Sequence, residues 1–202
     1  MKTIPFFLLM LIFAFCNSPE QNNGNTTDKG LKDTTTVTDD TPKTLYEANY
    51  TNEAGRYKCY FPNGYKPVEE ADVVKSPDGN LTVYSVTYET DVLQFSVRYC
   101  DYPQKVMKKF SKQEIMMNVI TGFFRNMDLN VTKQDSTELF DGYPSLMTMG
   151  QKNNAEVNGS MYVYRKDLMV DNRLYQVGVI RLDHYPESTD FEQFIYTFKI
   201  LK

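Results

Sequence analysis

The segment 161–182 constrains the fold of this chain more than any other. It has two arms rich in β-branched and aromatic residues, 161–170 and 173–180, joined by Asp171-Asn172. Asp and Asn tolerate the positive φ angles that a two-residue hairpin turn requires. We therefore predict a β-hairpin at the centre of the domain.

A two-residue turn sets the register of this hairpin. The predicted pairs are Leu168–Tyr175 and Tyr164–Val179 on one side, and Met169–Leu174 and Val163–Ile180 on the other. Both sides are largely apolar, so each must be covered. We predict an α+β fold, in which an antiparallel β-sheet is packed by helices on its two faces.

Two later segments supply the predicted helices. Ser111 and Glu114 have the spacing of a capping box at the start of a helix over 112–127, and Thr189 and Glu192 have it at the start of a last helix. The first helix carries a broad apolar stripe typical of core packing: Ile115, Met116, Val119, Ile120, Phe123, Phe124 and Met127. The apolar face of the last helix is Phe191, Phe194, Ile195 and Phe198.

Alternating polarity between turn residues predicts further strands. They fall at 57–61, 72–76, 81–88 and 93–99 before the first helix, and more weakly at 129–134, 136–140 and 145–149 after it.

The first sixteen residues have the form of an export signal. A positive charge precedes an apolar run over 4–15, which is shorter than the ~20 residues that a membrane span needs. The run ends at Cys16, and the segment resembles a bacterial lipoprotein signal, in which this cysteine is acylated. In such signals the residue just before the cysteine is usually small and the residue three before it is aliphatic, whereas Phe15 and Phe13 stand at these positions here. A cleaved signal without lipid and an uncleaved anchor are the alternatives.

Residues 17–43 are polar and contain too little apolar surface to offset the entropy of folding, which predicts a disordered linker. A flexible chain of that length spans about 30 Å on average. The remainder, 44–202, has a length suited to a single domain with its own core.

Composition narrows the classes of function. A net charge of −4 with mixed signs lacks the basic footprint of a nucleic-acid-binding protein. Cys59 and Cys100 either form a disulfide in an oxidising compartment or stay buried as thiols. One histidine and no Cys/His cluster leave few arrangements for zinc. We predict no cofactor and no metal site.

The candidate for catalysis is His184, beside Asp183. Neighbours on an extended chain point to opposite sides, so Asp183 does not orient this imidazole. Nucleophile elbows, phosphate-binding loops, dinucleotide fingerprints and EF-hand loops are absent from the sequence. We therefore predict no catalytic residues and no enzyme activity.

Tyrosines suggest a contact surface. The chain has 15 Tyr and no Trp, and a half-buried Tyr can offer its hydroxyl to a partner. Tyr102, Tyr143 and Tyr185 each precede a proline at the end of a predicted element. The alternative is that these X-Pro pairs simply end strands.

The order of short motifs in 45–202 resembles the PsbP-like and DcrB-like superfamily of small bacterial envelope domains. These motifs are Tyr-x-Cys-Tyr-Phe-Pro at 57–62, Tyr-Cys-Asp-Tyr-Pro at 99–103, Asp-Gly-Tyr-Pro at 141–144, Asn-Arg-Leu-Tyr at 172–175, and the closing helix 191–198. The resemblance implies a sandwich of helices about an antiparallel sheet, in exported proteins or lipoproteins that bind other proteins. Ser145 departs from the glycine usual after the Gly-Tyr-Pro motif.

Together these features predict an exported, non-enzymatic protein of the bacterial cell envelope. It would be tethered to a membrane through a lipid anchor at Cys16, face the periplasm or the cell surface, and bind an unidentified envelope protein as an interaction or assembly module. The alternative is a carrier or sensor of a small apolar ligand, held between sheet and helix near Met116, Phe123 and Phe194.

Overall fold

The computed structural model describes residues 47–62, 66–76, 78–136, 139–154, 159–182 and 188–202. The helices in these ranges are α1 (Gln104–Met107), α2 (Lys112–Asn126) and α3 (Ser188–Thr197). The strands are β1 (Tyr50–Asn52), β2 (Tyr57–Cys59), β3 (Val68–Ser76), β4 (Gly79–Glu89), β5 (Leu93–Asp101), β6 (Asn130–Asp135), β7 (Leu139–Phe140), β8 (Tyr143–Asn154), β9 (Gly159–Val170), β10 (Arg173–Arg181) and β11 (Lys199–Ile200).

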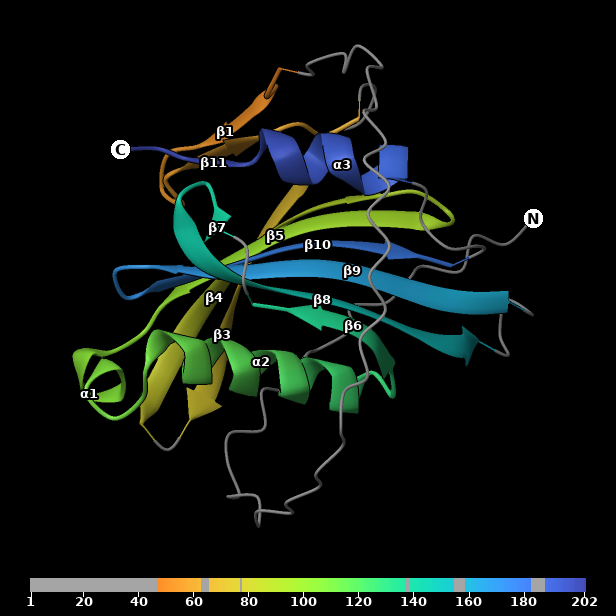
Figure 1. Ribbon diagram of the computed structural model, residues 1–202. Coiled ribbons are helices and arrows are strands. Elements are labelled where there is room, and N and C mark those ends of the chain that lie inside the picture. The colour runs from red at the N-terminus through yellow and green to blue at the C-terminus, as the bar shows by residue number, and fades with distance from the viewer. Residues whose placement is uncertain (1–46, 63–65, 77, 137–138, 155–158, 183–187) are drawn as a thin grey trace, which may run out of the picture.

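The strands form two antiparallel sheets (Figure 1). The large sheet has the order β3-β4-β5-β10-β9-β8-β6, with β7 paired to β8. The small sheet has the order β1-β2-β11. Sequence neighbours pair throughout the large sheet except at β5–β10 and β6–β8, which join segments separated by other elements.

The predicted hairpin is confirmed as β9 and β10, in the middle of the large sheet. Leu168 pairs with Tyr175 and Met169 with Leu174, and the other two predicted pairs are also present. Asp171 adopts a φ of 54° in the turn, as the turn chemistry predicts.

One face of the large sheet is covered by α2. The predicted capping box is present: the Ser111 backbone N donates to Glu114 Oε2 over 2.7 Å, and the Glu114 backbone N donates to Ser111 Oγ over 3.2 Å. The apolar stripe of the helix packs against Leu146, Val163 and Met169 of the sheet. We call the residues buried on this side the α2-side cluster.

The opposite face is covered by α3 together with the small sheet (Figure 1). Aromatic rings dominate the contact. The ring centre of Phe194 in α3 lies 5.2 Å from that of Phe95 and 5.3 Å from that of Phe61. The ring of Tyr57 in β2 stacks on that of Phe198, with 5.3 Å between the ring centres. We call the residues buried on this side the α3-side cluster.

The predicted fold class is wrong. The described residues form mainly strands, in two sheets, and the second face is not covered by a helix alone. The reason is length: the ten residues of α3 span ~15 Å, whereas the twelve residues of β9 span ~40 Å. The strands β1, β2 and β11 cover apolar surface beyond the reach of this helix.

Gly150 of β8 lies where α2 crosses the sheet, and it generates a prediction. A Cβ at this position would collide with the Phe124 ring and lie 2.8 Å from the Asn130 carbonyl oxygen. We expect Gly150→Ala to lower the free energy of unfolding by about 2 kcal/mol, because a backbone atom cannot move aside easily. Urea unfolding of the purified protein measures this.

The matched control is Gly122→Ala on α2, where a Cβ would meet nothing within 4 Å. Alanine favours a helix over glycine, so this change should raise the free energy of unfolding by up to about 1 kcal/mol. Equal effects at the two positions would contradict the close approach of α2 to β8.

Candidate functional site

A row of polar residues crosses the large sheet on the side of α2. Its members are successive cross-strand neighbours on β3, β4, β5, β10 and β9, in this order: Glu70, Ser85, Arg98, Gln176 and Asp167. Side chains two residues apart on a strand face the same way. By this rule Gln176 and Asp167 lie on the face of the large sheet that carries the α2-side cluster.

A second polar row runs beside the first. It consists of cross-strand neighbours on β5, β10, β9 and β8, in this order: Ser96, Gly178, Arg165 and Thr148. We call the two rows together the polar band. Because a sheet face under a helix is normally apolar, this band needs an explanation in terms of bonding or function.

Within the band, Arg165 and Asp167 satisfy each other. Arg165 Nε donates to Asp167 Oδ2 over 2.8 Å, and Nη2 donates to Oδ1 over 2.5 Å. The Phe123 ring of α2 lies 4.7 Å from the Arg165 guanidinium carbon. Burial raises the pKa of the Asp167 carboxyl, and the ion pair with Arg165 opposes that rise. The positive charge of Arg165 is therefore balanced.

Arg98 is not balanced in this way. Its guanidinium makes no hydrogen bond or ion pair with any residue in the part of the chain that the structure describes. Burial lowers the pKa of Arg98, the nearby charge of Arg165 lowers it further, and Asp72 and Glu70 partly offset both effects. The carboxylates of Asp72 and Glu70 therefore oppose part of the cost of burying this charge.

Gln176, the cross-strand neighbour of Arg98, also has an unused donor. Gln176 is 6% exposed, and its buried Nε2 atom has no hydrogen-bond partner among the described residues. The side chain lies beside Asp167 and helps to lower the pKa of that carboxyl, but Nε2 reaches no acceptor in good geometry. The unused donor of Gln176 therefore lies next to the carboxylate of Asp167.

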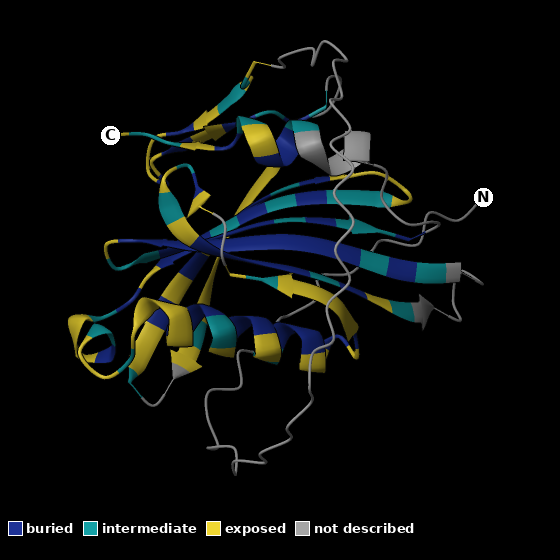
Figure 2. Cartoon of the chain, viewed as in Figure 1, coloured by how far each residue is buried: buried dark blue, intermediate teal, exposed yellow. Residues whose placement is uncertain are grey.

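The band ends at β3, an edge of the large sheet. Among the described residues β3 pairs only with β4. Val68 and Val73 on this strand are 59% and 63% exposed, and Glu70 and Asp72 are exposed as well. Figure 2 shows the contrast with the hairpin strands β9 and β10, which are largely buried.

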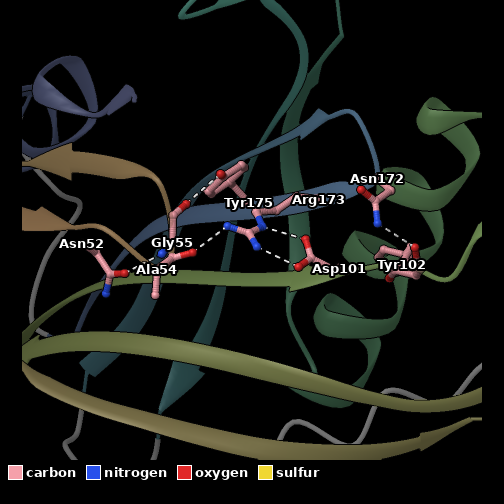
Figure 3. A network of polar contacts seen from close by, with 8 residues as sticks. All are labelled: Asn52, Ala54, Gly55, Asp101, Tyr102, Asn172, Arg173 and Tyr175. Carbon is pink, nitrogen blue, oxygen red and sulfur yellow. Dashed lines mark hydrogen bonds and ion pairs between the residues drawn. The ribbon is translucent and has the colours of Figure 1, made fainter. Parts of the chain in front are cut away.

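A separate polar network ties the small sheet to the hairpin (Figure 3). Arg173 Nε and Nη2 donate to the two carboxylate oxygens of Asp101 over 2.6 and 2.7 Å, and Nη1 donates to the Ala54 carbonyl over 2.8 Å. The Tyr175 hydroxyl donates to the Gly55 carbonyl over 2.7 Å. Every side chain in this set has a partner, so the network is structural.

The predicted contact surface is not assembled. Tyr102 is buried in the α2-side cluster, and its carbonyl accepts from Asn172 Nδ2 over 3.0 Å. Tyr143 packs against the α3-side cluster on the other face. These two tyrosines therefore do not share a surface. Tyr185, like His184 and Cys16, lies outside the described residues.

The two domain cysteines are also separated by the sheet. Cys59 belongs to the α3-side cluster and Cys100 to the α2-side cluster, and both are free, so the disulfide considered from the sequence is not formed. Burial raises the pKa of both thiols, to about 12 for Cys100.

The residues considered for an apolar ligand are divided in the same way. Met116 and Phe123 lie in the α2-side cluster, whereas Phe194 lies in the α3-side cluster. The large sheet separates them, so these three side chains do not line one common space.

Sequence reasoning missed Arg98 and Gln176. The available signal was the pair Arg165 and Asp167, which alternate with Val163 and Met169 on an otherwise apolar side of the hairpin. Arg98 could not be added to them, because its neighbours depend on the pairing of β5 with β10. Among the described residues no group of three or more His, Cys, Asp or Glu could hold a metal ion.

Comparison with known proteins adds one distant likeness. A crystal structure of a protein from Bacteroides thetaiotaomicron VPI-5482, at 1.50 Å resolution, matches with a TM-score of 0.43 and 11% sequence identity. The match covers 77% of this chain and 49% of that one, so this chain spans about half the length of the matched chain. No family model and no curated protein matches the sequence.

The Asp101–Arg173 pair generates a pH prediction. The hydrogen bonds from Arg173 lower the pKa of the Asp101 carboxyl below its ordinary value. A lowered pKa stabilises the fold above the unfolded pKa of about 3.9, and this stabilisation is lost as the pH falls through the folded value. We expect Asp101→Asn to cost about 0.5–1 kcal/mol at pH 7, because the carboxylate is half-exposed.

The measurement is urea unfolding of wild type and variant between pH 7 and pH 3. The difference between them should shrink as the pH falls below about 4. The control is Asp91→Asn, which removes the same negative charge from an exposed residue in the β4–β5 turn. A difference that is independent of pH would show that the ion pair is not what Asp101 contributes.

Proposed function

We propose that this chain is an exported, membrane-tethered, non-enzymatic protein of the bacterial cell envelope that binds a partner protein through β3. The lipoprotein-like signal ending at Cys16 and the polar linker 17–43 support the tether. Membership of the PsbP-like and DcrB-like superfamily stays a prediction. In the described part of the chain, no helix is both long enough and apolar enough to span a bilayer.

The observation that carries this proposal is the unpaired edge of β3. The strand has nine residues and is paired on one side only within the described residues. Its other side presents backbone donors and acceptors, which an extended segment of another protein can pair with by adding a strand. Val68 and Val73 would give such a segment apolar contacts.

Charge indicates what kind of segment fits. Glu70 and Asp72 are exposed and face the side of the polar band, and Lys75 supplies the basic residue of the strand. Side chains that lie opposite each other on neighbouring strands attract when their charges differ. The expected occupant is therefore an extended basic segment of an envelope protein.

Site-specific photo-crosslinking of the full-length protein in its own cells tests the proposal. A photoreactive phenylalanine at Val73 should give one discrete adduct with a protein. The same residue at Val131 should not, although Val131 is 52% exposed on the opposite edge strand, β6. This control matches exposure and strand position.

Two further variants make the result specific. Glu70→Lys with Asp72→Lys should reduce the Val73 adduct severalfold, because it replaces attraction of a basic segment by repulsion. Cys16→Ser should abolish the adduct by releasing the protein from its membrane. An equal adduct from Val131, or none from Val73, would overturn the assignment to β3.

A further inference from the structure

We propose that the lysine-rich segment around α1 binds the surface of an anionic phospholipid bilayer. Four lysines fall within eight residues of the chain, and all of them are exposed: Lys105, Lys108, Lys109 and Lys112. We call these four side chains the α1 patch. The span 102–113 contains no Asp or Glu, although acidic residues outnumber Lys and Arg by 26 to 22 in the whole chain. Positive charge is thus concentrated on α1 and the turn that follows it.

The backbone of this segment directs the lysines to the outside. The Lys108 backbone N donates to the Gln104 carbonyl over 3.0 Å, and the Lys109 backbone N donates to the Val106 carbonyl over 2.9 Å. Residues three and four apart lie on the same side of such a helical turn, so Lys105 projects together with Lys108 and Lys109. Val106 is buried in the α2-side cluster and fixes the turn to one end of the large sheet (Figure 1).

Most of the charge in the α1 patch is unpaired. Lys109 Nζ lies 3.0 Å from Asp78 Oδ1, in the turn between β3 and β4. The side chains of Lys105, Lys108 and Lys112 make no ion pair or hydrogen bond within the described residues. Like charges three or four residues apart on a helical turn repel each other. An anionic surface would relieve this repulsion.

Apolar side chains beside the α1 patch suit a lipid surface. Met107 and Phe110 are half-buried and pack against the α2-side cluster, so part of each side chain stays at the surface between the lysines. Segments that lie on membranes combine basic residues, which attract anionic headgroups, with apolar groups that enter the boundary below them. A soluble acidic partner would use the charge alone.

The choice of a bilayer over another anionic partner rests on the proposed tether. The linker 17–43 spans about 30 Å on average, so an anchor at Cys16 would keep the domain close to the membrane and raise the effective concentration of the α1 patch at the lipid surface. Salt screens exposed charges over ~8 Å at physiological ionic strength. The patch would therefore orient a tethered domain, and it would not replace the anchor.

Co-sedimentation of the purified full-length Cys16→Ser protein with vesicles tests the patch without a lipid anchor. The vesicles consist of phosphatidylcholine alone or of phosphatidylcholine mixed with phosphatidylglycerol. Neutral vesicles measure any binding by the apolar run 4–15, which all variants share. We expect the affinity for the mixed vesicles to be at least about tenfold higher. This preference should fall as the salt concentration rises, because exposed charges are screened.

Variants assign the preference to the patch. Lys105→Gln with Lys108→Gln should reduce the preference by about tenfold, because each lysine near an anionic surface adds to the attraction. The same two positions changed to Arg should keep it. If the glutamine pair fails to fold, Lys112→Gln decides the question and should reduce the preference severalfold.

The matched control is Lys58→Gln with Lys133→Gln. This pair removes the same charge from exposed positions on β2 and β6, outside the α1 patch. It should change the preference for anionic vesicles by less than twofold.

Three results would overturn the inference. The first is equal affinity for the two kinds of vesicle. The second is an equal loss in the control pair, which would indicate an effect of net charge. The third is tighter binding to soluble polyglutamate than to mixed vesicles, which would indicate an acidic polypeptide as the partner. None of these results bears on the β3 partner or the tether, which the crosslinks at Val73 test separately.

Discussion

Burial of both sides of the β9–β10 hairpin is the constraint on which the rest of the structure depends. Leu168 and Tyr175 are fully buried on one side, and Met169 and Leu174 are nearly so on the other. Side chains alternate along a strand, so a slip by one residue would exchange the two sides. The register therefore decides which residues meet α2 and which meet α3 and the small sheet.

The two covers differ in chemistry and in how they are attached. The α2-side cluster contains many Met, Leu, Ile and Val residues, whereas the α3-side cluster is rich in aromatic rings that contact edge to face. Arg173 starts β10 and binds the turn between β1 and β2. The hairpin thus also holds the small sheet in place.

The polar band opposes the rest of this packing. Among the described residues, Arg98 is half-buried without a hydrogen bond and the Gln176 amide nitrogen is buried without an acceptor, and both arrangements cost stability. Neither residue is needed to close the core, because apolar side chains at Arg98 and Gln176 would continue the neighbouring rows of Cys100 and Leu174. Natural proteins concentrate such departures from local consistency at functional or strained sites.

The sequence by itself determined what depends on near neighbours: the Asp171-Asn172 turn, the register of the hairpin, and the capping box and buried stripe of α2. Tertiary structure decided the rest. The small sheet joins β2 to β11 across most of the chain, and the polar band joins residues of several strands. The reason is that sheet order follows from long-range pairing, which no local pattern of residues encodes.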